Sequence, residues 1–260
     1  LFDQPAYKNV VSNGLVLDKD GNKMSKSKGN TVEPFEVIQE YGADTVRWYM
    51  MSNSSPWENL RFSEEGLRET QRKFFNTIVN TYSFFAMYAN IDGFTYSGSQ
   101  IPVSDRVEMD RWIISRMNTT VKLVDEYLDD YEPTKTARTI ENFVDELSNW
   151  YVRRNRRRFW KEGKSLDKQA AYQTLYECLV DLAKLISPIA PFLGEWLYQR
   201  LNEVTEVDEE SVHISFYPTV EETAIDKQLE HRMELARHIS SMVLSLRNKL
   251  ELNVRQPLSH

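Results

Sequence analysis

The sequence has a single cysteine and no long apolar run, and each absence excludes a class of protein. Cys178 stands alone, so the chain can form neither a disulfide framework nor a metal site of four thiolates. Charged residues interrupt every apolar stretch well short of the roughly 18 to 20 residues that a membrane-spanning helix needs. No basic segment followed by an apolar one opens the chain, so no secretion signal is predicted. We therefore expect a cytoplasmic protein, and Leu1 in place of an initiator methionine indicates truncation.

Histidine is also scarce. Only His231 and His238 share a helix face, and their separation of seven residues, about two helical turns, is too long for one ion without further ligands. His213 and His260 have no partner at a metal-binding spacing. The sequence therefore predicts no metal site in this chain.

The net charge of -7 argues against general attraction to a polyanion. The basic residues are nevertheless concentrated at two places, which predicts two local sites for phosphate groups. The first group is Lys19, Lys23, Lys26 and Lys28, and the second is Arg153, Arg154, Arg156, Arg157 and Arg158. Acidic residues gather at positions 206–210, where we expect a solvated loop.

Near the N-terminus the pattern indicates strands and turns. Asn13-Gly14 lies between Val10-Val11 and Leu15-Val16-Leu17, an arrangement typical of a β-hairpin with a tight turn. The polar stretch 23–30 has no periodicity and contains a glycine, so a mobile loop is expected there. Short helices are predicted from Pro34 and from Asp44.

From about Ser63 the apolar residues recur at helical spacing, which predicts long helices. The pattern also gives one short strand over 212–216. The predicted fold class is mainly α, a helical bundle preceded by a small α/β segment that carries the lysine-rich loop. The expected helices cover about 63–90, 109–130, 133–151, 175–186, 192–197 and 229–250.

The lysine-rich loop has the residue types that suit a polyphosphate. When a carboxylate attacks the α-phosphate of a nucleotide, negative charge develops there and on the departing pyrophosphate, so mobile cations that engage at that moment lower the barrier. On composition alone, a solvated lysine-rich turn is the more ordinary interpretation. The residue order changes this, because Lys23 to Ser27 reads KMSKS.

KMSKS is the signature of class I aminoacyl-tRNA synthetases, which the chain resembles. Here the motif lies between Asn13-Gly14-Leu15-Val16-Leu17-Asp18 and Tyr41-Gly42-Ala43-Asp44, as in the family's passage from its catalytic domain to its helical domain. The resemblance implies that ATP, with Mg²⁺, is the cofactor of the whole enzyme. It also implies that Lys23 and Lys26 are catalytic, and that Lys23, Ser25, Lys26 and Ser27 bind the nucleotide.

The arginine-rich segment extends the apolar stripe that ends at Trp150 and Tyr151. Continuing that stripe at the helical period reaches Arg154 and Arg158, so the face is expected to leave the core there. Arginine forks pair with phosphates, and exposed aromatic rings stack on unpaired bases. The alternative is an arginine-rich helix end neutralised by acids of neighbouring helices. The residues predicted to bind RNA are Trp150, Arg153, Arg154, Arg157, Arg158 and Trp160.

This segment resembles a helix of the anticodon domains of the isoleucyl, valyl and leucyl enzymes. Ser187-Pro188-Ile189-Ala190-Pro191-Phe192 and Val254-Arg255-Gln256-Pro257-Leu258 resemble later parts of the same domain. Residues 56–62, 73–77 and 82–85 resemble the isoleucyl branch. The resemblance implies three parts. They are the end of a Rossmann-type catalytic domain with a stem-contact region at 1–62, an anticodon-binding bundle at 63–205, and a truncated strand and long helix at 206–260.

The family's other catalytic motif, a histidine-containing tetrapeptide, and an inserted editing domain do not occur here. The resemblance therefore implies a C-terminal piece that makes no aminoacyl adenylate alone. The full enzyme would join isoleucine to tRNA(Ile), with ATP as co-substrate. A monomer without a membrane partner is expected, although the residues do not establish the oligomeric state. Three alternatives remain open: a piece of the valyl enzyme, a non-catalytic RNA-binding helical module and a plain structural bundle.

Overall fold

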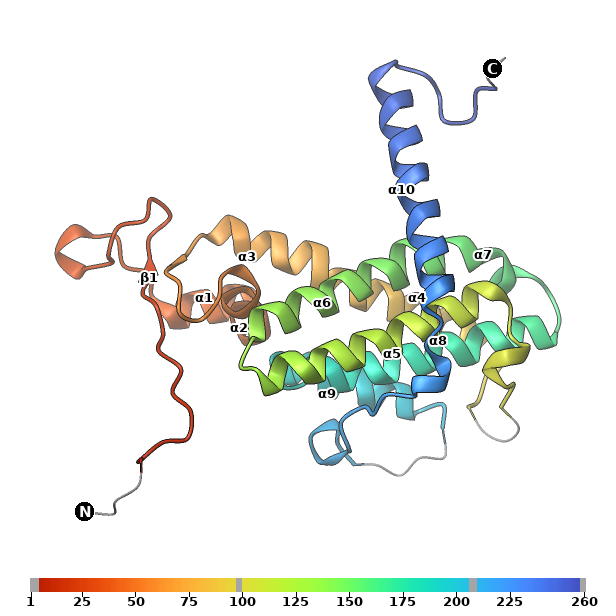
Figure 1. Cartoon of the computed structure of the whole chain (residues 1–260), viewed down its shortest axis with the longest axis horizontal. Coiled ribbons are helices and arrows are strands. Elements are labelled where there is room, and N and C mark those ends of the chain that lie inside the picture. Colours follow the sequence, from red (N-terminus) through yellow and green to blue (C-terminus); the bar gives the residue numbers. More distant parts are fainter. Residues whose placement is uncertain (1–4, 97–99, 206–209, 258–260) are drawn as a thin grey trace.

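The apolar stripes of the sequence form helices in the computed structural model, which describes residues 5–96, 100–205 and 210–257 (Figure 1). The predicted mainly α fold class is confirmed. Two strands, β1 (Val16–Leu17) and β2 (Leu60–Arg61), form the one small sheet of these ranges. The described helices are α1 (Pro34–Tyr41), α2 (Ala43–Asn53), α3 (Glu64–Thr70), α4 (Asn76–Asp92), α5 (Glu108–Asp129), α6 (Pro133–Asp145), α7 (Arg153–Trp160), α8 (Leu166–Ile186), α9 (Pro191–Asn202) and α10 (Lys227–Lys249).

Two of the predicted long helices contain a π-helical turn. Gln71–Phe75 joins α3 to α4, and Glu146–Val152 joins α6 to α7. Each π turn adds one residue to the helical turn, so side chains beyond it are rotated relative to those before it. The predicted helix from Ser63 is confirmed, and the Ser63 hydroxyl caps it by accepting from the Gly66 backbone N–H at 3.1 Å.

The core of the bundle lies among α4, α5, α6, α8 and α9. Its side chains are the ones that the apolar stripes placed on one face of each helix, so they become buried when the helices pack together. A smaller cluster lies beside it, under the N-terminal segment, and includes Val37, Tyr41, Tyr49, Leu60 and Leu67. The largest fully buried side chains of the main core include Trp48, Phe85, Trp112, Phe143, Tyr151 and Tyr198.

Helix α2 fastens the N-terminal segment to the bundle. The Trp48 indole N–H donates to Glu141 Oε1 of α6 at 2.8 Å. Arg47 Nε donates to the Ile189 carbonyl at 2.8 Å, and Asp44 Oδ2 accepts from the Leu193 backbone N–H of α9 at 2.7 Å. These three bonds join elements far apart in sequence. They fix the position of the segment that carries the lysine-rich loop.

The predicted β-hairpin around Asn13-Gly14 is wrong. β1 pairs in parallel with β2, which lies more than forty residues later, and Val10 is 75% exposed outside any strand. Gly14 is needed for close approach rather than for a hairpin turn, because a Cβ there would lie 2.1 Å from the Glu58 carbonyl oxygen. The Gly14 N–H donates to the Pro56 carbonyl at 2.7 Å. Asn13-Gly14 thus suggested a hairpin, although the strand that pairs with β1 is the distant β2.

The predicted strand over 212–216 is also wrong. Residues Val212–Ile214 form a single 3-10 turn in which Val212 is buried, whereas Ile214 and Phe216 are exposed. Alternation of apolar residues cannot distinguish a strand from an irregular segment that buries one side chain. Most of the predicted acidic loop at 206–210, and His260, lie outside the described residues.

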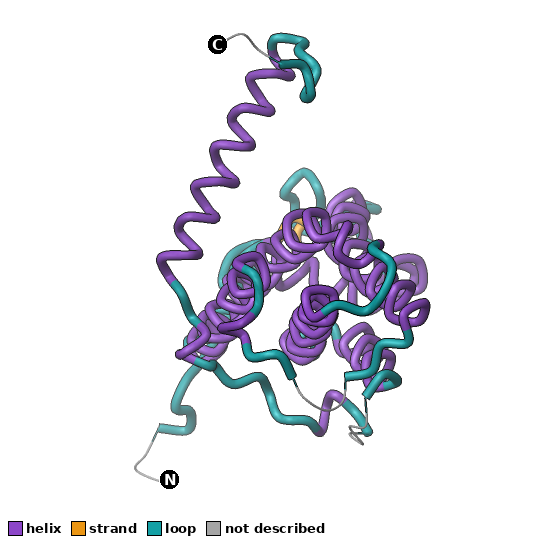
Figure 2. Tube along the Cα trace, turned by 90° about the vertical axis from the view of Figure 1, so that its right-hand side faces the viewer, coloured by secondary structure: helices purple, strands orange, loops and turns teal. Residues whose placement is uncertain are grey.

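Helix α10 leaves the bundle after its first turns, as Figures 1 and 2 show. Leu229 and Glu230 are buried against α5, while Leu235, Ile239 and Met242 are exposed. The predicted long helix over 229–250 is confirmed. No helix among the described residues is long and apolar enough to cross a membrane.

The carboxyl group of Asp181 makes stability depend on pH. Desolvation of its carboxyl group in α8 raises the pKa of Asp181 to about 6, well above the usual range for aspartate. The folded state therefore holds the Asp181 proton more tightly than the unfolded chain does. The stability that the protonated carboxyl group contributes is lost as the pH rises from about 4 through about 6. Asp181→Asn is expected to raise the free energy of unfolding by up to about 3 kcal/mol at pH 7.5, and by much less at pH 4, in urea titrations.

Glu162→Gln is the matched control, because Glu162 is exposed. This variant should follow the wild type at both pH values. An Asp181→Asn effect of the same size at pH 4 and pH 7.5 would contradict the assignment to Asp181.

Candidate functional site

The lysine-rich loop contains a short helical turn, and its lysine side chains are exposed. Lys26–Lys28 form one 3-10 turn, closed by Gly29 in the left-handed region at φ 64°. Lys23, Lys26 and Lys28 are exposed. Over the described ranges, none of the three ammonium groups has a carboxylate within 4.0 Å. The loop therefore presents positive charge that no acid of the described chain neutralises.

A hydrogen-bonded brace connects the two ends of this loop. The Asn30 side-chain carbonyl accepts from the Ser25 backbone N–H at 2.9 Å, and its amide group donates to Asp18 Oδ2 at 2.8 Å and to the Lys23 carbonyl at 3.3 Å. The bond from Asn30 lowers the pKa of Asp18, as do the backbone N–H of Asn22 and other donors. The hydroxyls of Ser25 and Ser27 lie 3.2 Å apart. The predicted nucleotide-binding residues are thus brought together in one turn.

The arginine-rich helix α7 is oriented differently from the sequence prediction. Buried residues continue through Asn155 and Phe159, rather than changing to Arg154 and Arg158, and Phe159 is only 1% exposed. The expectation that this face leaves the core is therefore wrong. The reason is the π turn Glu146–Val152, which shifts the buried face by one residue.

The Arg158 guanidinium is held by carboxylates of the chain itself, so it is not available to bind RNA. Its guanidinium donates to Asp110 Oδ1 at 2.6 Å and to Asp110 Oδ2 at 2.8 Å, and it pairs with Asp167 at 2.9 Å. The Arg158 side chain is only 13% exposed, and that of Asp110 is fully buried. For Arg158, the alternative prediction is therefore correct: acidic residues of neighbouring helices neutralise its charge.

The remaining arginines of α7 are exposed. In the part of the chain that the structure describes, Arg153, Arg154, Arg156 and Arg157 have no carboxylate within 4.0 Å. The Arg154 guanidinium lies 4.5 Å from the ring centroid of Trp150, which orients it. Trp160 is 53% exposed at the end of the helix. Cations and an accessible aromatic ring thus share one surface, which we call the α7 surface.

The lysine-rich loop and the α7 surface lie at opposite ends of the molecule along its long axis (Figure 1). The two predicted groups of basic residues therefore lie apart from one another. Sequence reasoning missed Asn30 as the brace of the loop, although it lies only three residues after Ser27, the last residue of the motif. It also missed Arg237 of α10, whose guanidinium lies 5.6 Å from the Trp150 ring centroid. No local pattern marks Arg237, because its partner is far away in sequence.

Comparison with known families gives two matches. Residues 110–260 match the model of the anticodon-binding domain of tRNA ligase. Residues 1–63 match the model of tRNA synthetases class I (I, L, M and V). The first match covers the α7 surface and the second covers the lysine-rich loop.

Curated relatives carry the name isoleucine–tRNA ligase. The protein of Bacteroides fragilis is 56% identical over 260 residues, which is 99% of this chain and 23% of the relative. That of Cytophaga hutchinsonii is 55% identical, over 100% of this chain and 24% of its own length. The chain thus spans about a quarter of these relatives.

Among solved structures, the ternary complex of Agrobacterium radiobacter K84 agnB2 LeuRS-tRNA-LeuAMS is similar in fold. The TM-score is 0.62 at 20% sequence identity, and the match covers 82% of this chain and 24% of that one. At this identity the likeness concerns the fold alone.

Proposed function

Because the chain belongs to the family of anticodon-binding domains of tRNA ligases, with a class I tRNA synthetase segment before it, we propose that it is part of an isoleucine–tRNA ligase. The whole protein would activate isoleucine with ATP and transfer it to tRNA(Ile). The observation that carries the proposal is identity of 54 to 56% to ligases of this name along almost the whole chain. These relatives favour the isoleucyl branch over the valyl alternative.

The lysine-rich loop would bind the phosphates of ATP. The isoleucine carboxylate attacks the α-phosphate, the bond to the β-phosphate breaks, and pyrophosphate leaves with the negative charge that develops. Lys26 and Lys23 are free to approach that charge, and Ser25 and Ser27 can donate to phosphate oxygens. Asn30 and Asp18 would hold the base of the loop in shape while the lysine side chains move toward the phosphates.

The residues of this chain fit the phosphates better than they fit a metal ion. Across the described ranges, no group of three His, Cys, Asp or Glu side chains could hold a metal. Mg²⁺, which the family normally uses, would be bound together with ATP and would supply charge neutralisation for the phosphates.

The α7 surface would bind the tRNA. Arg153, Arg154 and Arg157 can donate to phosphates, and Trp160 can stack on an unpaired base. Trp150 contributes by orienting Arg154. We do not include Arg158 among the proposed RNA-binding residues, because its guanidinium is already paired with Asp110. We further propose a cytoplasmic monomer, with the division between synthetase segment and bundle near residues 62 and 63.

The double substitution Arg154→Ala and Arg157→Ala tests this surface. Both side chains are exposed and have no carboxylate within 4.0 Å among the described residues, so the fold should be little affected while phosphate contacts are lost. We expect roughly tenfold weaker binding of a tRNA(Ile) anticodon hairpin at 0.1 M salt. The plot of log affinity against log salt concentration should become shallower, with the magnitude of its negative slope reduced by about 1 to 2.

Lys135→Ala with Lys122→Ala is the matched control, since these two exposed cations are already paired with Glu132 and Glu222. Fluorescence anisotropy over a series of salt concentrations measures both quantities. If wild-type binding did not depend on salt, the chain would be a structural bundle without an RNA site. If the arginine variant kept full affinity, the tRNA site would lie elsewhere.

A further inference from the structure

The Asn30 side chain fits its place in the lysine-rich loop in one orientation only. Its carbonyl oxygen accepts from the Ser25 backbone N–H at 2.9 Å, and its NH₂ group donates to Asp18 Oδ2 at 2.8 Å and to the Lys23 carbonyl at 3.3 Å. Turning the amide over would set the NH₂ group against the Ser25 N–H and the oxygen against a carboxylate. The polar atoms around Asn30 therefore fix how it closes the loop.

Asp18 anchors this brace to the body of the molecule. Its Oδ1 atom accepts from the backbone N–H of Asn22 at 2.7 Å and of Asp20 at 3.0 Å, which fixes the carboxylate in its own turn. The preceding residue, Leu17, belongs to β1, and its carbonyl accepts from the Phe62 N–H at 2.9 Å, directly after β2. Asn30 thus ties the loop to the sheet and not only to itself.

Apolar contacts hold the loop at its two ends but not between them. Met24 and Val32 are half-buried against the small cluster that includes Leu60 and Leu67. None of the side chains of residues 25–31 is buried. Over this stretch the backbone is therefore positioned by hydrogen bonds, and Asn30 is the side chain that links both ends of the loop.

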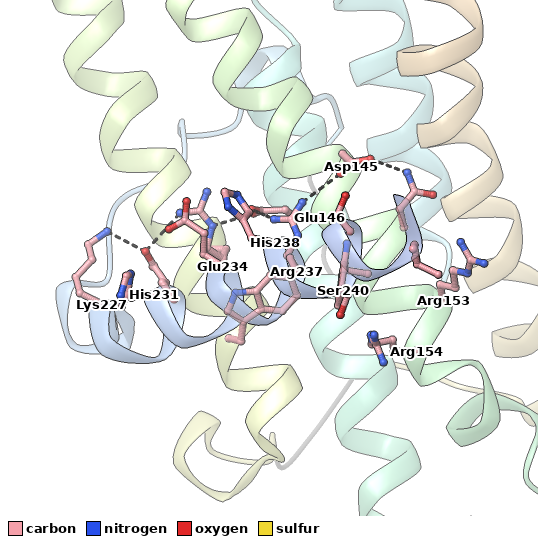
Figure 3. Close-up of a pocket in the computed structure, with 17 residues that line it drawn as sticks. Asp145, Glu146, Arg153, Arg154, Lys227, His231, Glu234, Arg237, His238 and Ser240 are labelled. Atoms are coloured by element: carbon pink, nitrogen blue, oxygen red, sulfur yellow. Dashed lines mark hydrogen bonds and ion pairs between the residues drawn. The ribbon is translucent and has the colours of Figure 1, made fainter. Parts of the chain in front are cut away.

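The lysine cations have no contacts of their own that would position them. The guanidinium of Arg237 on α10 is held by Glu146 and Asp145, so its place is set at the charged end of the side chain (Figure 3). In the described part of the chain, no carboxylate holds the ammonium groups of the lysine-rich loop. Their starting positions depend instead on the backbone that carries them.

We propose that Asn30 is a positioning residue for the reaction with ATP, and that it acts through Lys26. It holds Ser25, the residue directly before Lys26, at a fixed place relative to Asp18. The lysine side chain then moves toward the phosphates from one backbone position rather than from many, so less conformational freedom is lost when it engages. The inference rests on the proposed function and adds a group that controls the rate without touching ATP.

Asn30→Ala in the whole protein removes all three bonds of the brace. We expect kcat of isoleucine-dependent pyrophosphate exchange to fall roughly 10- to 100-fold, the usual range when a catalytic group is displaced by a fraction of its length. KM for isoleucine should stay the same, because Asn30 acts on the phosphate side. Asn22→Ala is the matched control, since the Asn22 side chain is exposed and makes only one long contact, 3.5 Å to Asp18 Oδ2. It should stay close to the wild type.

An exchange of the two side chains separates the hydrogen bond from a general need for polar residues. Asp18→Asn alone sets two NH₂ groups against each other, and Asn30→Asp alone sets two carboxylates together, so each should slow exchange about tenfold or more. In the double variant, the amide introduced at position 18 donates to the carboxylate introduced at position 30, which still accepts from the Ser25 N–H. The net charge is that of the wild type. We expect kcat to recover to within about fivefold of the wild type.

The Lys26→Ala background tests whether Asn30 acts through that cation. Once the ammonium group is absent, its position no longer matters, so adding Asn30→Ala should slow exchange by no more than about twofold further. A residue that only keeps the protein folded would multiply its full effect onto that of Lys26→Ala. It would also lower the thermal unfolding temperature, which we expect to be the same for Asn30→Ala and Asn22→Ala.

Three results would overturn the inference: Asn30→Ala as fast as Asn22→Ala, a double exchange variant as slow as the two single effects multiplied, or a fully multiplicative effect on Lys26→Ala. Failure of the proposed function gives a different result. If the whole wild-type protein catalysed no isoleucine-dependent exchange, both proposals would be refuted. If Lys26→Ala were slow and Asn30→Ala were not, the phosphate-binding loop would stand and only the role of Asn30 would be refuted.

Discussion

Asp110→Ala is expected to lower the free energy of unfolding by about 3 to 5 kcal/mol, a large part of the stability of an ordinary domain. Asp110 is fully buried on α5 and accepts from both Arg158 nitrogens and from the Tyr151 hydroxyl at 2.7 Å. Removing the carboxylate leaves a cation at 13% side-chain exposure with only Asp167 as its acidic partner, and leaves Tyr151 with one long contact to the Ala171 carbonyl at 3.5 Å. Urea unfolding followed by circular dichroism measures the loss.

Glu126→Ala provides the comparison on the same helix, because Glu126 is exposed on α5. It should change the unfolding free energy by no more than about 0.5 kcal/mol. Arg158→Lys should lie between the two, since an ammonium group cannot reproduce the two parallel bonds of the guanidinium. If Asp110→Ala were as stable as Glu126→Ala, the buried pair would not hold α5 and α7 together.

The long helices could be predicted from the sequence because burial of an amphipathic face repeats at a regular spacing. The stripe of Ile140, Phe143 and Leu147 is an example, and all three side chains are buried. Prolines at helix starts, such as Pro34 and Pro133, marked boundaries correctly. Strand pairing could not be predicted in the same way, because the partner of Val16 is Leu60 and nothing near either residue specifies the other.

The candidate sites were predicted only in part, for a related reason. The lysine motif is contiguous, so its residues necessarily lie in one loop. The arginines of α7 are contiguous too, but the direction in which each side chain points depends on the π turn Glu146–Val152. The spacing of apolar residues does not predict that turn. Arg158 was placed on the RNA surface because its partner Asp110 lies 48 residues away. The sequence was therefore enough to place each candidate site along the chain. The structure was needed to tell which single residues are exposed and which are paired within the fold.

If the whole protein is the isoleucine–tRNA ligase proposed above, Lys26→Ala in it is expected to slow isoleucine-dependent pyrophosphate exchange by about 100- to 1000-fold, the usual effect of losing one group that stabilises charge in the transition state. Lys26 is exposed and makes no ion pair among the described residues, so its removal should leave the unfolding free energy unchanged. Because the ammonium group would engage mainly as charge develops, the loss should appear in kcat, with KM for ATP changing little.

Lys19→Ala separates this effect from a general loss of positive charge. Lys19 is exposed on the turn just before the motif and outside the brace formed by Asp18 and Asn30. It carries the same charge, so a purely long-range attraction of ATP would make the two variants alike, with a higher KM that depends on salt. A mobile cation that acts on the departing pyrophosphate predicts instead that only Lys26→Ala lowers kcat. Equal behaviour of the two variants would exclude Lys26 from the reaction.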